Sequence, residues 1–442
     1  MNTLSDLRAG KLAGIKRLDL SCGLTTFPDE IFELADSLEV LNLSGNSLSD
    51  LPSDLPRLHK LRVIFCSDNR FMHVPEVLGQ CANLEMIGFK ANQIGHLSPQ
   101  ALPPKLRWLI LTDNRLQALP AQIGSCTRLQ KLMLAGNQLN ALPPEMAACT
   151  NLELLRIAAN RFTQLPAWLP SLPRLAWLAY AGNPFSDASE QAAMEQHAIA
   201  SVAWHALELQ HTLGEGASGI IYRAHRTTEH GVHPVAVKMF KGALTSDGLP
   251  RSEKAACIAA GAHPNLIPLQ GRINAHPDGT RGLVMSLIDT SFVNLAGPPS
   301  LESCTRDIYP AATRFTHDQV LRIALGIASA TAHLHARGVM HGDLYAHNIL
   351  LNEKGECLLG DFGAASFLPM HDAPLNSGLQ RIEARAFGCL LEELLERCDV
   401  SPNGQTIVGA LYALQQRCVQ SQNEARPLFN EIVDEIGMLV YV

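Results

Sequence analysis

The sequence predicts a two-domain protein, an α/β solenoid with a parallel β-sheet followed by an α+β domain. Two observations lead to this prediction. In the first half, the pattern L-x-x-L-x-L-x-x-N recurs with its asparagine at 46, 69, 92, 114, 137, 160 and 183. The second half contains a glycine-rich run, an apolar segment that ends in lysine, and the motifs HGDLYAHN at 341–348 and DFG at 361–363.

The repeat spacing defines the first domain. Successive asparagines are 23, 23, 22, 23, 23 and 23 residues apart, and Gly23 lies one further period before Asn46. In repeats of this length each unit supplies one short strand to a horseshoe-shaped sheet. Residues 10–185 resemble a leucine-rich repeat solenoid. We therefore assign 1–185, about eight repeats of 22–23 residues, to this domain.

The strands of the repeats predict an apolar concave face. Alternation points leucines such as Leu41 and Leu43 inward and leaves the residues between them on the surface. We expect those residues to form one exposed apolar stripe, a groove for a separate protein partner or for the second domain of the same chain. Scattered apolar groups on such a face are also ordinary. The stripe comprises Val63, Phe65, Met86, Trp108, Ile110, Met133, Leu154 and Trp177.

Residues 186–205 are rich in alanine and are predicted to form a helix. Ser186 or Asp187 is suited to cap its first turn. We expect this helical linker to cap the last repeat and to hold it in a fixed or semi-fixed position against the domain at 206–442, because a flexible Gly/Ser linker is absent.

The acidic motifs indicate phosphoryl transfer. That reaction requires a carboxylate to orient the attacking hydroxyl and oxygen ligands for metal ions, roles that fit Asp343, Asn348 and Asp361. Upstream, the order is a G-x-G-x-x-G run, then VAVK ending at Lys238, then Glu253 in a helical stretch. A strand-like segment follows the glycines, which argues against a dinucleotide-binding fold. The whole order resembles the eukaryotic-type protein kinases over 206–442.

This resemblance implies a bilobal fold that binds ATP and Mg²⁺. It implies that Asp343 orients the hydroxyl, that Lys238 and Glu253 position the phosphates, and that Asn348 and Asp361 hold the metal. It further implies nucleotide contacts from the glycine loop, the adjoining strands and the hinge, at Leu213, Gly214, Gly216, Gly219, Ile221, Ala236, Lys238, Met285 and Leu287.

Several positions depart from the kinase pattern. Gly342 replaces the arginine that precedes the catalytic aspartate in most regulated protein kinases, so phosphorylation of the activation segment cannot act through it. Tyr345 stands where serine/threonine kinases usually have a lysine that contacts the γ-phosphate. No A-P-E triplet lies between Gly363 and Glu383, so Arg426 needs another partner than the missing glutamate.

The predicted function is an ATP- and Mg²⁺-dependent protein kinase directed to serine or threonine, with repeats that bind or regulate. Two alternatives stay open. One is a scaffold or pseudokinase that binds nucleotide without efficient transfer. The other is a small-molecule phosphotransferase, because HGDxxxxN also resembles the catalytic run of aminoglycoside and choline kinases.

Composition limits the setting. The 442 residues carry a net charge of −7, which does not suggest a nucleic acid partner. The eleven cysteines include no CxxC pair. The sequence also contains no run of about eighteen apolar residues, the length needed to span a membrane. We expect a cytoplasmic protein. This expectation includes a secreted effector that acts in the cytosol of a host cell.

Overall fold

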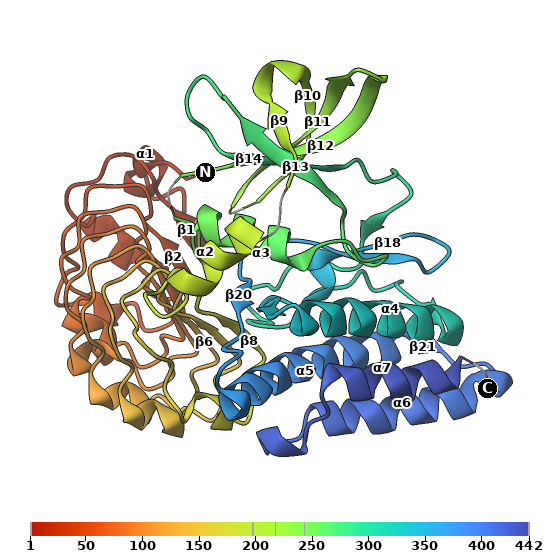
Figure 1. The fold of residues 1–442 in the computed structure, drawn as a ribbon. Helices are drawn as coiled ribbons and strands as arrows, with labels where there is room; N and C mark the ends of the chain where they lie inside the picture. The colour runs from red at the N-terminus through yellow and green to blue at the C-terminus, as the bar shows by residue number, and fades with distance from the viewer. Residues whose placement is uncertain (1, 197–198, 217, 243, 441–442) are drawn as a thin grey trace. The chain divides into compact units, whose positions relative to one another are not determined.

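The computed structural model describes residues 2–196, 199–216, 218–242 and 244–440. The chain divides into two compact units, Met1–Leu172 and Pro173–Val442, both drawn in Figure 1. The domain limits predicted from the sequence, 1–185, 186–205 and 206–442, stay predictions.

The first unit is a coil of short parallel strands, one for each repeat. Neighbouring strands pair without offset, so that Leu41 lies beside Ile64 and Ile64 beside Ile87. This arrangement confirms the predicted leucine-rich repeat solenoid. Its strands are β1 (Arg17–Asp19), β2 (Val40–Asn42), β3 (Val63–Phe65), β4 (Met86–Gly88), β5 (Trp108–Ile110), β6 (Lys131–Met133) and β7 (Leu154–Arg156). Its helical turns are α1 (Leu4–Arg8), η1 (Asp29–Leu34), η2 (Leu55–Arg57), η3 (Glu76–Gln80), η4 (Pro99–Ala101), η5 (Ala121–Ser125), η6 (Pro144–Ala148) and η7 (Leu169–Ser171).

The repeated asparagines stabilise the turns that follow the strands. The side-chain amide of Asn114 donates to the carbonyls of Phe89 at 2.8 Å and Leu111 at 3.1 Å. Its amide oxygen accepts the backbone N–H of Ile94 at 2.9 Å. These backbone groups are buried away from water, so each lost hydrogen bond would be costly. The asparagine period is therefore a structural requirement of the fold.

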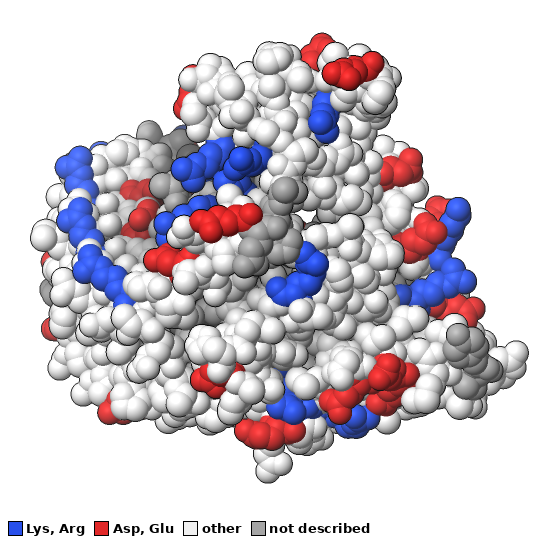
Figure 2. Space-filling view, viewed as in Figure 1, with Lys and Arg blue, Asp and Glu red and all other residues white. Residues whose placement is uncertain are grey.

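Charged residues that immediately precede the strands form ion pairs across the repeats. Arg62 contacts Glu85 at 2.9 Å and Glu39 at 3.9 Å, and Lys16 contacts Glu39 at 2.9 Å. On the face drawn in Figure 2, Lys and Arg form a row over the first unit, while both signs of charge are interspersed elsewhere. Exposed pairs of this kind contribute little to stability but balance the local charge.

The predicted continuous apolar stripe is wrong, because most of its members are buried. Val63 and Met86 are 5% and 2% exposed; they stand at equivalent positions of adjacent strands and shield each other. Phe65 lies over Gly88, where an added Cβ would come within 2.5 Å of its ring. Phe65, Trp108 and Ile110 keep partial exposure, whereas Met133, Leu154 and Trp177 are buried.

The second unit has a six-stranded antiparallel and mixed sheet, a helix beside it, and a mainly helical part, as Figure 1 shows. This confirms the predicted α+β kinase-like fold. The sheet has the order β10-β11-β12-β14-β13-β9. The strands are β8 (Trp177–Ala179), β9 (Ser201–Ala203), β10 (Leu207–Glu215), β11 (Gly219–Thr228), β12 (Gly231–Phe240), β13 (Leu269–Asn274), β14 (Gly282–Ser286), β15 (Val293–Asn294), β16 (Phe315–Thr316), β17 (Val339–Met340), β18 (Ile349–Leu351), β19 (Cys357–Leu359), β20 (Ser366–Phe367) and β21 (Cys398–Asp399). The helices are α2 (Asp187–Gln196), α3 (Pro250–Ala260), α4 (His317–Ala336), α5 (Ala373–Leu395), α6 (Gln405–Cys418) and α7 (Phe429–Leu439), with turns η8 (Trp204–Ala206), η9 (Ala346–Asn348), η10 (Pro402–Gly404) and η11 (Asn423–Ala425).

The helix predicted over 186–205 is shorter in the structure. Helix α2 ends at Gln196, residues 197–198 lie outside the described part, and Ser201–Ala203 form strand β9 beside β13. Val202, 2% exposed, packs with Leu207 and Val284 in the core of the sheet. The alanine-rich composition favoured a helix, but burial of this one β-branched residue favours the strand.

Within the described residues, none of the helices combines the length and apolar character needed to cross a membrane.

Candidate active site

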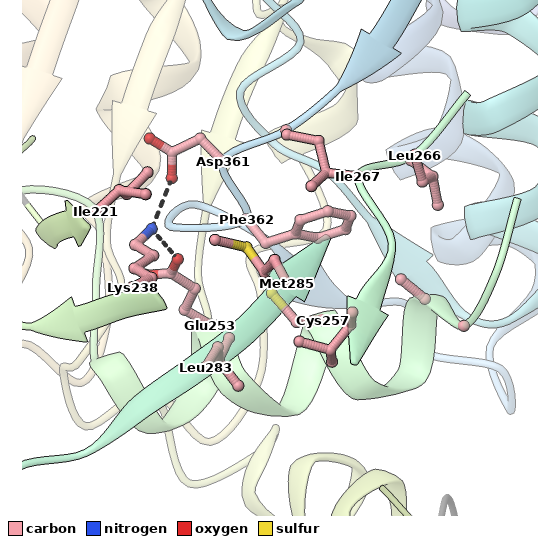
Figure 3. A pocket seen from close by; sticks show the side chains of 14 residues that line it. Ile221, Lys238, Glu253, Cys257, Leu266, Ile267, Leu283, Met285, Asp361 and Phe362 are labelled. Atoms are coloured by element: carbon pink, nitrogen blue, oxygen red, sulfur yellow. Dashed lines mark hydrogen bonds and ion pairs between the residues drawn. The ribbon is translucent and has the colours of Figure 1, made fainter. Parts of the chain in front are cut away.

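Lys238, Glu253 and Asp361 meet at one end of the sheet. Lys238 lies near the end of β12, opposite Ile221 of β11, and Glu253 projects from α3. The Lys238 ammonium donates to Glu253 Oε1 and lies 3.6 Å from Asp361 Oδ1, as the dashed lines in Figure 3 show. Burial acts to lower the pKa of Lys238, but the carboxylates of Asp361 and Glu253 outweigh it and raise that pKa. The ammonium is therefore charged and fixed in place.

The loop 341–348 holds Asp343 and Asn348 together. The amide nitrogen of Asn348 donates to Asp343 Oδ2 at 2.8 Å and to the Asp343 carbonyl at 2.9 Å. His341 Nε2 hydrogen-bonds the Gly360 carbonyl at 2.9 Å, and its Nδ1 accepts the Asp343 N–H at 3.3 Å. A ring with the proton on Nε2 satisfies both bonds. His341 thus braces the loop.

Glu383 of α5 holds the loop 341–348 through hydrogen bonds to its backbone. Its carboxylate accepts the N–H of Gly342 at 2.7 Å and of His341 at 3.2 Å, and it contacts His335 Nε2 at 2.7 Å. Burial acts to raise the pKa of Glu383, but the hydrogen bond from His335 and the other donors outweigh burial and lower it. The carboxylate therefore stays ionised and holds two successive backbone groups in front of Asp343.

His347 contributes a second polar anchor beside the site. Its Nδ1 lies 2.7 Å from Asp307 Oδ1, and its backbone N–H donates to Asp307 Oδ2 at 2.9 Å. Burial acts to lower the pKa of His347, but the bond to Asp307 and the charges of Asp343 and Asp361 outweigh it, so the pKa is raised.

Asp361 adopts a left-handed backbone, with φ of +52°. Aspartate tolerates this conformation better than most residues. The Gly363 N–H donates to Asp361 Oδ1 at 3.1 Å. Desolvation acts to raise the pKa of Asp361, but Lys238 and this N–H outweigh it and lower the pKa. An ionised carboxylate here and the amide oxygen of Asn348 are the oxygen ligands that Mg²⁺ prefers.

A cleft of about 680 Å³, measured out to its open mouth, is lined in part by Lys238, Glu253 and Asp361. Of the predicted nucleotide contacts, Ile221, Lys238 and Met285 line it (Figure 3). Ala236 pairs with Met285 across β12 and β14 and is buried. Leu213, 47% exposed, and Leu287 do not line this cleft.

The glycine loop fits a phosphate-binding role. Among the described residues, nothing lies within 4 Å of a Cβ added at Gly214 or Gly216, whereas a Cβ at Gly219 would lie 2.4 Å from the Met239 carbonyl. Gly219 is therefore required by the packing of β11 on β12, and the first two glycines leave open space. That space suits close approach of a phosphate group to the backbone.

The sequence did not reveal the inner, apolar part of the cleft. Its lining includes Cys257, Leu266, Ile267, Leu269, Leu283 and Phe362. Three of these had a signal in the sequence. Cys257 lies one helical turn after Glu253, and Leu283 lies two residues before Met285 on the same strand face. Phe362 is the middle residue of the DFG motif. Leu269 begins β13, and Leu266 and Ile267 enter from the segment before it, whose course the sequence does not specify.

Arg426 finds backbone partners in place of the missing glutamate. It is 1% exposed and donates to the carbonyls of Gln420 at 2.8 Å, Arg381 at 3.3 Å and Pro173 at 2.7 Å. Burial lowers its pKa to about 10, with a smaller effect from nearby Arg385. Arg426 thus links the closing region of the second unit to its first residue.

Comparison with known proteins agrees with this site. Residues 207–385 match the protein tyrosine and serine/threonine kinase family, and residues 37–58 match the leucine rich repeat family. The chain carries a protein kinase domain. The leucine-rich repeats precede it.

Individual relatives match less than half of this chain. The chain is 27% identical to a probable serine/threonine-protein kinase of Arabidopsis thaliana over 175 residues, 35% of this chain and 28% of that protein. It is 31% identical to the proto-oncogene serine/threonine-protein kinase mos of Rattus norvegicus over 169 residues, 37% and 48% of the two chains. It is 29% identical to a probable LRR receptor-like serine/threonine-protein kinase of Arabidopsis thaliana over 197 residues, 42% and 19%. The matches thus span less than half the length of each relative.

Proposed function

We propose that this protein transfers the γ-phosphoryl group of ATP to a serine or threonine hydroxyl of a protein substrate, with Mg²⁺ as cofactor. The main support is the site itself, in which Lys238 is paired with Glu253 and faces Asp361. Asn348 holds Asp343 at the adjoining loop. This set of an ammonium, three carboxylates and an amide meets the requirements of phosphoryl transfer.

Each side chain has a role in this proposal. Asp343 orients the substrate hydroxyl and accepts its proton, while Asn348 fixes the carboxylate in position. Lys238, held by Glu253, contacts the nucleotide phosphates. Asn348 and Asp361 would hold Mg²⁺, which when bound neutralises charge on the phosphates. The open space at Gly214 and Gly216 accommodates those phosphates.

The scaffold alternative has one structural observation in its favour. Tyr345, where kinases usually have a lysine, is 5% exposed and stacks on Trp177, so it supplies no cation to the γ-phosphate. Slow transfer would follow from that loss. The small-molecule alternative has less support. The described residues 368–372 lead from β20 directly to α5, so no helix that could bind a small substrate is inserted between these two elements.

The solenoid is proposed to bind a protein through the partly exposed Phe65, Trp108 and Ile110. A cytoplasmic location is proposed as well. It is supported by the cysteines, since the described part of the chain contains no disulfide and most of its thiols are buried.

The test is incubation of the full-length protein with γ-labelled ATP, Mg²⁺ and generic protein substrates. Asp343→Ala is the inactive variant, and Asp318→Ala, an exposed aspartate at the start of α4, is the matched control. Mass spectrometry then identifies the modified residues. Label on serine or threonine with the native and control proteins, and not with Asp343→Ala, supports the proposal. Label on a small molecule alone, or no label, contradicts it.

A further inference from the structure

One short segment of the second unit contacts several parts of the active site. It runs from Pro173 to Gln196, comprises β8, the following turn and α2, and is called the brace below. It corresponds to the last predicted repeat, whose asparagine is Asn183, and to the first part of the linker helix predicted over 186–205.

The first contact explains Gly342. Its φ is +74°, and an added Cβ would lie 2.5 Å from the Leu178 carbonyl and 2.6 Å from the Ala364 carbonyl. The backbone of β8 therefore occupies the space beside the catalytic loop into which a side chain would project. Glycine at this position is required by close packing.

The second contact involves Trp177, which is 2% exposed. Its indole ring stacks on Tyr345, with centroids 4.2 Å apart and planes inclined by 6°. Its Nε1–H donates to the Leu344 carbonyl at 3.1 Å. Leu344 and Tyr345 directly follow Asp343, so Trp177 and Leu178 hold the loop on both sides of that carboxylate.

The third contact reaches the segment after DFG. The backbone N–H of Tyr180 donates to Ser366 Oγ at 3.0 Å, and its hydroxyl donates to the Phe367 carbonyl at 3.1 Å. Ser366 is fully buried. The buried site has no room for a phosphate group on Ser366. The hydrogen bond between Tyr180 and Ser366 therefore belongs to the unphosphorylated protein.

The fourth contact reaches helix α3. Ser252, which precedes Glu253, donates to Glu190 Oε2 of α2 at 2.7 Å. The other oxygen of Glu190 accepts the N–H of Gly182 at 2.7 Å and the hydroxyl of Ser186 at 2.8 Å. Glu190 is 6% exposed, so these bonds are shielded from water.

We infer that the brace positions the catalytic loop and helix α3, in place of a phosphorylated activation segment. This inference rests on the proposed kinase function. Trp177, Tyr180 and Glu190 act through other residues and are positioning residues. Kinases usually obtain this order from phosphate-arginine contacts, which Gly342 cannot make. Here the last repeat supplies it, so the aligned site needs no phosphorylation of 364–372.

The test combines hydrogen exchange with kinetics on the full-length chain. The variants are Trp177→Ala, Trp177→Phe, Tyr180→Phe and Glu190→Gln. Trp168→Ala is the control for the tryptophan, since Trp168 lies in the first unit at the start of η7. Glu195→Gln on α2 is the control for Glu190, since Glu195 is exposed and bonds to Gln191 of its own helix.

We expect Trp177→Ala to accelerate amide exchange in 341–348 by at least about tenfold, since local opening follows lost contacts. It should lower kcat about tenfold with the KM for ATP within about twofold, because the loop acts on the transition state. Trp177→Phe keeps an aromatic ring stacked on Tyr345, so its exchange rate and its kcat should lie between those of the native protein and of Trp177→Ala. Glu190→Gln should accelerate exchange in 250–260 and raise the KM for ATP through Lys238.

Exchange in both segments at the native rate in Trp177→Ala and Glu190→Gln would overturn the inference. If Trp177→Ala does not fold, Tyr180→Phe and Glu190→Gln decide by the same readout. If the native chain transfers no phosphate, the proposed function fails, yet exchange still shows whether the brace orders the loop.

Discussion

Replacement of Gly342 by alanine tests the packing of β8 against the catalytic loop. The residue has φ of +74°, which costs a non-glycine residue about 1–2 kcal/mol. The new Cβ would also lie 2.5 Å from the Leu178 carbonyl and 2.6 Å from the Ala364 carbonyl. Overpacking of this kind costs about 1–3 kcal/mol. We expect a loss of about 2–5 kcal/mol in the free energy of unfolding, which for a unit of this size lowers Tm by roughly 4–20 °C.

Differential scanning calorimetry of the full-length protein measures this loss. Gly409→Ala is the matched control, because Gly409 lies in α6 and no described residue comes within 4 Å of an added Cβ, so alanine there should stabilise by about 0.5–1 kcal/mol. A change below about 1 kcal/mol in Gly342→Ala would refute the reasoning, since it would mean that β8 does not pack against the loop.

Three further predictions concern other parts of the chain. Asp307 raises the pKa of His347, so His347 contributes stability that is fully present below its ordinary pKa of 6.5 and is lost as pH rises through the raised value. His347→Gln should therefore flatten the dependence of Tm on pH above about 6.5. An unchanged profile of Tm against pH would contradict this prediction. Arg426→Lys loses the fork that reaches three carbonyls and should cost about 2–3 kcal/mol in urea denaturation, whereas a neutral effect would show that one ammonium suffices. Asn114→Ala leaves the buried N–H of Ile94 without its acceptor and removes one of two side-chain donors from the carbonyls of Phe89 and Leu111, so it should cost the first unit about 1–3 kcal/mol by the same method. Asn151→Ala, which loses an exposed bond to Thr127, should cost under about 0.5 kcal/mol, and equal losses would refute the role of the asparagine period.

The repeats could be predicted because one residue type does one backbone task at a fixed period. Asn114 and its equivalents satisfy the turn in each repeat from Asn46 onward, so their spacing alone sets the strand positions. The concave face could not be predicted in the same way. Burial of Met86 depends on the register between neighbouring strands and on the size of its neighbours, which the pattern of a single repeat does not contain.

The site was partly predictable for a related reason. Asp343, Asn348 and Asp361 stand in short motifs, and the structure pairs Asn348 with Asp343 and sets Asp361 at the cleft with Lys238 and Glu253. Each motif carries its own local geometry. The inner apolar lining depends on how loops pack around α3 and could not be read from spacing.

The contacts of the brace had no signal in the sequence. Trp177 and Tyr345 belong to different motifs far apart in the chain, and neither motif predicts that their rings stack. Gly342 was interpreted from the sequence as the loss of an arginine. The structure adds the physical reason, a carbonyl of β8 in the space that a side chain would need. The predicted linker helix failed at Val202, because its burial in the sheet outweighs the helix propensity of the alanines around it.

The central claim is that Asp343 takes part in phosphoryl transfer and not in nucleotide binding. The most direct test measures the rate of transfer from ATP to a mixed protein substrate, and the Kd for ATP, in native protein and in the isosteric Asp343→Asn. We predict that the rate falls by about 10²–10⁴-fold, as for loss of a general base, with the Kd for ATP within about threefold. ATP binding without transfer in the native protein, or equal rates in both, would contradict the kinase account and favour a nucleotide-binding scaffold.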